Sequence, residues 1–345
     1  MKKLISVCLI GAGRIGFKLE RDKKRLKPAT HFGMWSKNKK ANFLAIAEKK
    51  KINNKFRSFI PKSINIYSDF KKMISVEKPE IVSIATWKDS HYNITSKCID
   101  LGIKTIVLEK PLANNIYQAS ELHKKIKKNN VKILINHRRR FDEKVIKLKK
   151  QLRNNIIGDI LQVSAYYVYG ILTTGTHLID TLRMLLKDVA GEINYVIGLK
   201  NEFNNFSPTD DQNIDGVLIF KNNLKATIQC LNMKNYDNFD IYIYGTRGKI
   251  LITDIGRSGF LYKVINSPEH EGFNELSSQK ISLFGPSPRN QFGHLANNAI
   301  DCANNKEAKS FCDSYESLVD MIIIDSLIKS SKNNGKIKKV LLPNN

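Results

Sequence analysis

The chain has 345 residues, of which 42% are hydrophobic, and this size predicts a soluble, globular protein with two domains, each with its own core. No run of 18 or more apolar residues occurs, so the sequence predicts no membrane span. The apolar stretch at the N-terminus runs straight into glycines without a cleavage site of small residues, so we read it as a first strand rather than a signal peptide. We therefore expect a cytoplasmic protein.

The formal charge of +25 suggests a polyanionic partner such as nucleic acid. The lysines are spread along the chain among Asn and Ile, and no nucleic-acid-binding module accompanies them. This distribution favours an anionic small molecule and leaves nucleic-acid binding as the weakest hypothesis. The five cysteines form no CxxC pair and have no His partner at metal spacing, which predicts neither a disulfide framework nor a metal site.

In the first part of the chain, short apolar runs alternate with helical patterns, which is typical of βαβ units and a parallel sheet. The runs predict strands at residues 4–10, 43–47, 64–67, 80–86, 104–110 and 131–137. Asp69 and Ser90 stand where helix N-caps are expected, and Gly102 stands where a helix ends. We expect a Rossmann-type, doubly wound domain over residues 1–137.

From residue 138 to 345 the pattern changes to that of an α+β domain with a largely antiparallel sheet. A helical stretch (143–155) precedes strand-like runs joined by hairpin turns, and further helices are predicted at 175–186, 292–305 and 315–331. The runs lie at residues 160–169, 193–200, 215–221, 224–231, 239–245, 248–254 and 260–265.

Three glycines at GxGxxG spacing directly follow the first predicted strand. In such a turn Gly11 permits the tight bend, Gly13 lets the backbone approach a pyrophosphate, and Gly16 lets strand and helix pack closely. The following helix would offer its N-terminal N–H groups to the phosphates, so Arg14 and Ile15 belong to the same predicted cofactor segment.

Glu48 ends the second predicted strand, where an acidic residue can bind the adenosine ribose hydroxyls of NAD. Its distance from Gly16 is long because residues 21–35 are inserted, and His31 in that insertion has no assigned role. Lys49 and Lys50 follow at once and can bind a 2′-phosphate, so NAD is favoured and NADP is the alternative; a solvated helix start is a third reading of Glu48.

Glu109, Lys110 and Pro111 end another strand, at the edge where an open α/β sheet places its ligand, so Glu109 and Lys110 are candidate cofactor contacts. A lysine beside a nicotinamide can donate a hydrogen bond to a substrate hydroxyl and help to withdraw its proton. The competing reading is a surface lysine in a lysine-rich chain.

Five segments, in this order, resemble the glucose–fructose oxidoreductase and inositol dehydrogenase (Gfo/Idh/MocA) family over almost the whole chain. They are GAGRIG (11–16), SIATWKDSHYNI (83–94), LEKPLA (108–113), NHRRRF (136–141) and GTHLID (175–180). The resemblance implies a Rossmann domain, a second domain built on an open sheet, and homodimers or homotetramers formed through that sheet. It also implies hydride transfer at a carbon of a sugar, polyol or nucleotide sugar.

By this resemblance Lys110 and His177 are catalytic, and Asp180 binds a substrate hydroxyl. His177 and Asp180 lie three residues apart on one helix face, and a neutral imidazole can accept an alcohol proton near neutral pH. Many family members carry an aspartate four residues before the histidine, where this chain has Thr173. Threonine can bind a hydroxyl but cannot take up the proton, so base catalysis falls to His177, or this chemistry has been lost.

Other candidates lie around these motifs. Thr86 and Trp87 follow the fourth strand, where the family usually has Thr-Pro, and both are candidate cofactor contacts; Trp87 either lies along the cofactor or packs as a lid. His91 fits the histidine at the family's helix start, with a structural role or a role at the edge of the cofactor. Arg139, within the run 138–140, can bind a substrate phosphate or carboxylate. Tyr169 alternates with Tyr167 on a strand and is a candidate substrate contact. The stretch 166–183 resembles a branch associated with surface polysaccharides and nucleotide sugars.

These observations favour an NAD(P)-dependent dehydrogenase that acts on CH–OH groups of a sugar or nucleotide sugar. The alternative, suggested by Thr173, is a protein of the same fold that binds the dinucleotide and senses or regulates without catalysis.

Overall fold

Parallel strands form the centre of the first part of the chain in the computed structural model, which describes residues 3–50, 52, 57–202, 211–286 and 290–343. Within these residues the strand order is β3-β2-β1-β4-β5-β6. The strands are β1 (Ile5–Ile10), β2 (Ala41–Ala47), β3 (Asn65–Tyr67), β4 (Ile81–Ile84), β5 (Thr105–Leu108) and β6 (Lys132–Ile135). The strands β4 and β5 are buried at every position, as expected where helices cover both faces, and the predicted Rossmann sheet is confirmed.

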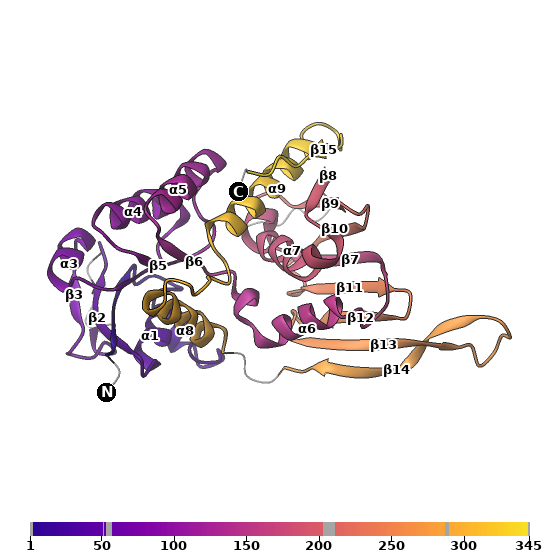
Figure 1. Ribbon diagram of the computed structural model, residues 1–345, viewed down its shortest axis with the longest axis horizontal. Helices are drawn as coiled ribbons and strands as arrows, with labels where there is room; N and C mark the ends of the chain where they lie inside the picture. The colour runs from indigo at the N-terminus through magenta and orange to yellow at the C-terminus, as the bar shows by residue number, and fades with distance from the viewer. Residues whose placement is uncertain (1–2, 51, 53–56, 203–210, 287–289, 344–345) are drawn as a thin grey trace. The chain divides into compact units, whose positions relative to one another are not determined.

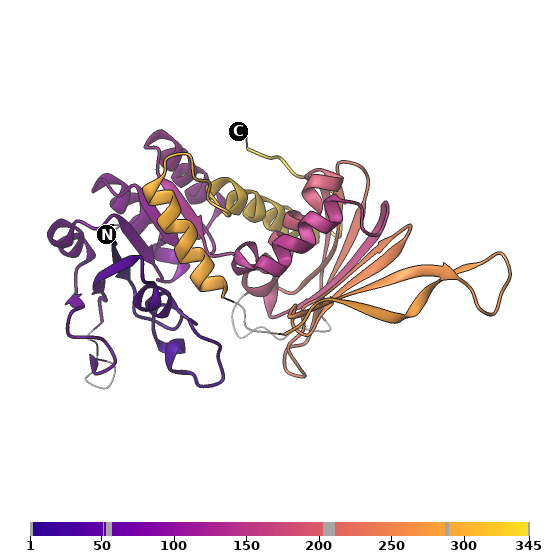
Figure 2. The same ribbon diagram turned by 60° about the horizontal axis from the view of Figure 1, so that its bottom comes forward.

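Helices cover both faces of this sheet (Figures 1 and 2), with α4 and α5 on one side and α1 and α8 on the other. The helices are α1 (His31–Lys37), α3 (Phe70–Glu77), α4 (Lys88–Asp100), α5 (Ile116–Lys128) and α8 (Gln291–Asn304), with short 3₁₀ turns η1 (Lys18–Arg21) and η2 (Arg138–Phe141). The chain divides into two compact units, and the first consists of Met1–Asp142 and Pro288–Leu318. Thus α8, which lies far along the sequence, packs on β4, β5 and β6.

The predicted helix ends are partly right. Asp69 caps α3 by accepting a hydrogen bond from Lys71 N, and Gly102, with a φ of +87°, follows the last residues of α4. The prediction for Ser90 is wrong, because α4 begins at Lys88. The Ser90 hydroxyl instead binds Thr86 Oγ1 and the carbonyl of Trp87 inside the first turn, both at 2.8 Å.

The second unit, Glu143–Ser287 and Val319–Asn345, contains a nine-stranded sheet among its described residues. Its order is β14-β13-β12-β11-β7-β10-β9-β8-β15, and all pairs are antiparallel except β7 with β10, which confirms the expected mostly antiparallel sheet. The strands are β7 (Ile160–Val168), β8 (Ile193–Lys200), β9 (Ile214–Phe220), β10 (Lys225–Leu231), β11 (Asp240–Gly245), β12 (Gly248–Thr253), β13 (Ser258–Asn266), β14 (Asn274–Phe284) and β15 (Lys338–Lys339).

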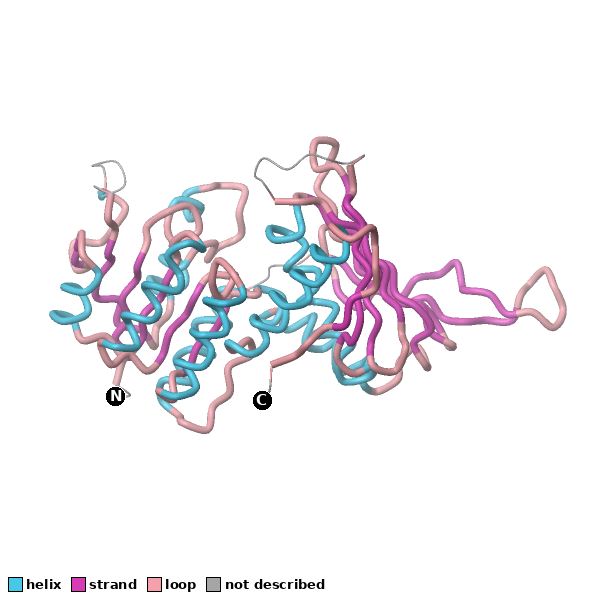
Figure 3. The backbone as a smooth tube through the Cα atoms, turned by 90° about the horizontal axis from the view of Figure 1, so that it is seen from above, coloured by secondary structure: helices cyan, strands magenta, loops and turns pink. Residues whose placement is uncertain are grey.

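Helices lie along one face of this sheet (Figure 3), and the other face carries none within the described part of the unit. They are α6 (Glu143–Arg153), the π-helical turn η3 (Gly170–Gly175), α7 (Thr176–Ala190) and α9 (Ser314–Ser331), whose residues from Val319 onward belong here. Gly198 and Gly216 let α9 approach closely, because a Cβ at either position would press on Leu327. Strand β14 is exposed along nearly its whole length, so it has no apolar run that would have predicted it.

Within the described ranges, no helix has both the length and the mean hydropathy that a bilayer crossing requires. All five cysteines are buried thiols.

Candidate functional site

The glycine turn between β1 and the next helical segment fits a bound dinucleotide. Gly11 has a φ of +96°, and a Cβ there would lie 2.8 Å from the carbonyl oxygen of Ala85; a Cβ at Gly16 would overlap Gly11 O. A Cβ at Gly13 would meet nothing within 4 Å. Gly11 and Gly16 are thus required by the fold, whereas Gly13 faces open space where a pyrophosphate can approach the backbone.

The helix after this turn is interrupted and then resumed. In a regular helix the carbonyls of Ile15 and Gly16 would accept from residues four positions later. Here they accept from His31 N and Phe32 N, at 3.2 and 2.8 Å, so α1 continues the helical path after a looped-out segment. The predicted insertion at 21–35 is therefore too long, because its last residues form α1. This resumption places His31 beneath the carboxyl end of the sheet.

His31 is the centre of a buried polar network that the sequence did not reveal. Its Nδ1 lies 2.7 Å from Ser83 Oγ on β4, and its Nε2 lies 2.8 Å from Oε1 of Glu109, directly after β5. The Asn136 amide donates to the same oxygen at 2.5 Å. Burial opposes ionisation of Glu109, but the hydrogen bond and charge of His31, with Asn136 and the charge of Lys110, lower its pKa to about 2.

Glu109 is therefore an anion fixed by two donors, and Lys110 follows it at the sheet edge. Glu109 is also predicted from the sequence to contact the cofactor, and that role stays a prediction. The contacts support a positioning role, in which Glu109 fixes the backbone that presents Lys110.

These contacts predict an acid-dependent loss of stability. The pKa of Glu109 is about 2 when folded and 4.5 ordinarily, so the folded protein binds this proton more weakly than the unfolded chain does. The stabilisation is complete above about pH 4.5 and is lost as the pH falls toward about 2. In urea unfolding at about pH 6 and about pH 3, we expect wild type to lose about 2 kcal/mol more than Glu109→Gln. Equal losses in both proteins would contradict this assignment.

His91 joins two loops at the edge of the sheet. Its Nδ1 lies 2.7 Å from the carbonyl of Pro111, and its Nε2 lies 3.1 Å from the carbonyl of Thr86. Burial lowers the pKa of His91 below its ordinary value, so the ring is neutral at pH 7 and donates one hydrogen bond. His91 thus ties the segment after Lys110 to the end of β4, while Trp87, the N-cap of α4, is 85% exposed.

Glu48 stands at the end of β2, beside the glycine turn. Its carboxylate accepts hydrogen bonds from Ala12 N at 2.7 Å and Lys50 N at 3.1 Å. A pocket of about 430 Å³ lies here and is lined by Glu48, Lys49, Lys50, Ile52, Arg57, Ile66, Tyr67 and Ser68. The pocket brings the predicted acidic residue and both lysines together and adds Arg57, which the sequence analysis missed.

In the second unit, η3 leads directly into α7. Thr173 lies in η3, and His177 and Asp180 lie on α7, so the predicted helix is confirmed. His177 is half-buried and Asp180 is buried. The strand argument for Tyr169 is wrong: β7 ends at Val168, and Tyr169 has a left-handed φ of 70°. Its contact with substrate stays a prediction.

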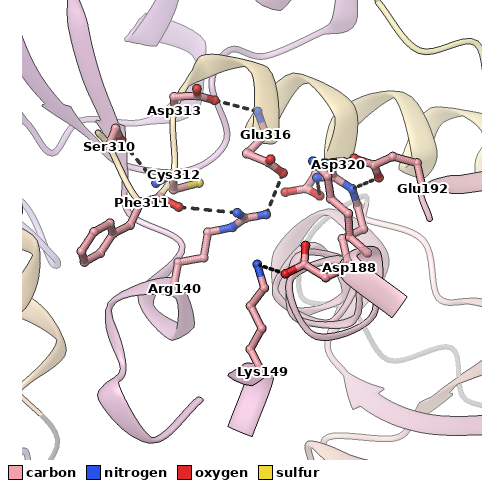
Figure 4. A network of polar contacts seen from close by, with 12 residues as sticks. Arg140, Lys149, Asp188, Glu192, Ser310, Phe311, Cys312, Asp313, Glu316 and Asp320 are labelled. Carbon is pink, nitrogen blue, oxygen red and sulfur yellow. Dashed lines mark hydrogen bonds and ion pairs between the residues drawn. The ribbon is translucent and has the colours of Figure 1, made fainter. Parts of the chain in front are cut away.

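The three arginines after β6 differ in their surroundings. The Arg140 side chain is 9% exposed, and its guanidinium donates to Glu316 Oε2 at 2.9 Å and faces Phe311 O at 3.5 Å (Figure 4). Arg140 therefore stabilises the first unit. Arg139 lies beside it in η2, and its proposed substrate contact remains a prediction.

Sequence reasoning missed Ser83, Asn136 and Asp211 and gave His31 no role. The signal for the first two was available, because a polar residue inside a fully buried strand, or at its end, needs a polar partner. Asp211 carried no such signal, since it lies in a loop before β9.

Residues 5–137 match the Gfo/Idh/MocA family, described as an oxidoreductase family with an NAD-binding Rossmann fold. An uncharacterized oxidoreductase of Escherichia coli, YhhX, is 21% identical over 225 residues, covering 61% of this chain and 63% of that protein. The chain spans less than two-thirds of the length of the curated relatives that it matches.

Two solved structures share the fold over nearly the whole chain. Levoglucosan dehydrogenase in complex with NADH superposes with a TM-score of 0.77 at 17% identity, covering 99% of this chain and 100% of that one. A super-repressor mutant of Gal80p from Saccharomyces cerevisiae gives 0.76 at 14% identity, covering 98% of each. The glycine turn and the sheet order agree with the family match, and residues 5–137 form an NAD-binding Rossmann domain similar to that of the Gfo/Idh/MocA oxidoreductases.

Proposed function

We propose that the protein is an NAD(P)-dependent dehydrogenase that interconverts a secondary alcohol and a ketone on a sugar, polyol or nucleotide sugar. The observation that carries this proposal is the arrangement around Lys110. Lys110 follows β5, two strands from the glycine turn, and the residue before it is fixed by His31 and Asn136. The fixed carboxylate of Glu109 supports a lysine held at one place at the carboxyl edge of the sheet.

The first unit supplies the residues that would hold the cofactor. Gly11, Gly13 and Gly16, with Arg14 and Ile15 between them, would hold the pyrophosphate, and Glu48 the adenosine ribose. Thr86, Trp87 and His91 surround the end of β4, which lies between β1 and β5 at the switch point of the sheet. A bound nicotinamide supplies the two-electron hydride chemistry.

The chain's own residues manage the alcohol proton. Lys110 donates a hydrogen bond to the reacting oxygen and stabilises its developing negative charge. His177 accepts the proton, because Thr173 has no basic group. Asp180 and Thr173, with Arg139 and Tyr169, would bind the remaining hydroxyl or phosphate groups of the substrate.

The pocket after β2 supports NAD as the preferred cofactor and keeps NADP as the alternative. Glu48 would bind both ribose hydroxyls and repel a 2′-phosphate, whereas Lys49, Lys50 and Arg57 would attract one.

Titration with NADH and NADPH tests this reading. Of the two tryptophans, Trp87 is 85% exposed and Trp35 is 1% exposed, so nicotinamide binding should quench the emission of Trp87. We expect Glu48→Gln, which keeps an acceptor for Ala12 N, to lower the preference for NADH by roughly 10-fold. Glu80→Gln is a matched control, because Glu80 also accepts a backbone N–H, from Ser6 on β1. Unaltered preference in Glu48→Gln, or no binding of either nucleotide, would contradict the proposal.

A second candidate function is a nucleotide-dependent sensor. Thr173 at the position of the family aspartate favours it, and the likeness to the Gal80p super-repressor mutant supports a regulatory use of this fold. Tight binding of NADH without turnover over a broad panel of sugars would support the sensor, and any sugar-dependent reduction of NAD excludes it.

A further inference from the structure

The turn that precedes the helix of His177 is held by a carboxylate from another part of the chain. Asp211, in the loop before β9, accepts two backbone hydrogen bonds from η3. Leu172 N donates to its Oδ1 at 2.9 Å, and Thr173 N donates to its Oδ2 at 2.7 Å. The two oxygens thus bind consecutive N–H groups at the start of the helical path, where no earlier carbonyl of the helix can accept them.

The backbone of η3 is shaped around this carboxylate. Tyr169 and Gly170 both have left-handed φ values, 70° and 82°, and a Cβ at Gly170 would overlap the carboxylate of Asp211. The carboxylate of Asp211 therefore packs directly against the bend at Tyr169 and Gly170. A π-helical turn of this kind often marks a functional site.

The loop that carries Asp211 is itself fixed to the same region. Ile171 N donates to the carbonyl of Gln212 at 2.9 Å. The buried Tyr167 hydroxyl donates to the carbonyl of Ile214 at 2.7 Å and accepts from Ile214 N at 3.1 Å. The bonds to Gln212 and Ile214, directly after Asp211, thus hold its carboxylate at a defined place relative to η3.

We propose that Asp211 is a positioning residue for the reaction: its carboxylate fixes the backbone of η3 through Leu172 N and Thr173 N, and so sets the orientation of Thr173 and His177. This inference rests on the proposed function, because it assumes that His177 acts on substrate. The negative charge of Asp211, ahead of the N-terminus of α7, also stabilises this helix, because the N-terminal end of the helix dipole is positive. Asparagine cannot replace it, because its amide has one acceptor oxygen and would turn an NH₂ group toward the second N–H.

The test compares Asp211→Asn with Asp215→Asn. Asp215 is a matched control on the adjacent strand, because its carboxylate also accepts a backbone N–H, from Cys230 at 2.8 Å, and an amide N–H, from Asn201 at 2.9 Å. We expect Asp211→Asn to lower kcat by roughly 10- to 100-fold while NADH affinity stays unchanged. Asp215→Asn, measured where it is fully folded, should keep kcat.

A spectroscopic signal separates this inference from the proposed function. The ring Cε1–H resonance of His177, assigned by its absence in His177→Gln, should move in Asp211→Asn and stay in place in Asp215→Asn. If wild type turns over no sugar, the proposed function fails, and this resonance alone decides whether Asp211 positions His177. An unmoved resonance, or an unchanged kcat in folded Asp211→Asn, overturns the inference.

Asp211→Glu provides a second variant if Asp211→Asn does not fold. It keeps both acceptor oxygens on a longer stem, so we expect it to fold and to retain more of kcat than Asp211→Asn or Asp211→Ala does. Turnover as low in the glutamate variant as in the alanine variant would show that the carboxylate is not what the turn requires.

Discussion

We expect Lys110→Met to lower kcat/KM by about 10²- to 10⁴-fold, the usual contribution of a positioned proton donor. Methionine keeps the length and apolar stem of the side chain but removes the ammonium group that would stabilise the reacting oxygen. Steady-state kinetics on the first sugar that reduces NAD would measure the loss, and NADH affinity, followed through Trp87, should change little.

Lys104→Met is the matched control for this variant. Lys104 is exposed and directly precedes β5, whereas Lys110 follows it. Lys104→Met therefore removes an equal charge far from the carboxyl edge of the sheet. We expect full activity from it. Full turnover by Lys110→Met would remove Lys110 from the mechanism.

We expect Arg183→Met to lower the free energy of unfolding by about 3–5 kcal/mol, the usual cost of removing one member of a buried ion pair. Arg183, on α7, is 0% exposed and donates to both carboxylate oxygens of Glu192, at 3.0 and 3.1 Å, and to Asp320 Oδ1 at 2.7 Å. Figure 4 shows Glu192, which directly precedes β8, and Asp320 on α9, and these bonds join both residues to α7. Methionine has similar volume and no charge, so Glu192 and Asp320 would both lose the guanidinium of Arg183.

Both tryptophans belong to the first unit, so tryptophan fluorescence does not follow the loss of stability around Arg183 in the second unit. Hydrogen exchange of the α7 amides would measure it directly. Lys187→Met is the control: Lys187 also contacts Glu192, at 2.9 Å, but its side chain is 35% exposed, and its loss should cost less than about 1 kcal/mol. Equal protection of α7 in wild type and Arg183→Met would contradict the assigned role of this cluster.

The order of elements was predictable from the sequence because local signals determine it. Buried strands such as IVSI and TIVL are apolar at nearly every position, and turn residues separate them from amphipathic helices. The glycine turn was predictable for the same reason, since its three glycines meet steric demands that other residues cannot.

Contacts between distant segments were not predictable. His31, Glu109 and Asn136 meet only because α1, β5 and β6 fold together, and nothing in their spacing indicates it. The return of α8 to the first sheet is equally hidden, because the predicted division at residue 137 follows composition, whereas packing brings Pro288–Leu318 back. Asp211 reaches Thr173 from a loop, so no periodicity connects them.

The looped-out segment between η1 and α1 has a consequence for how this chain should be aligned with its relatives. His31 N and Phe32 N donate to the carbonyls of Ile15 and Gly16, as the residues four positions later would do in a continuous helix. The looped-out segment therefore leaves the helical register unchanged. Its ends meet, with Glu20 binding Ala29 N and the Thr30 hydroxyl at its neck. An alignment gap within residues 19–30 restores the ordinary number of residues between the glycines and Glu48. A gap placed elsewhere would align His31 and β2 with the wrong residues of the relatives. Excursions of other lengths should be compatible with the same nucleotide fold, and the count of residues between the glycines and the acidic position is a poor guide to homology here.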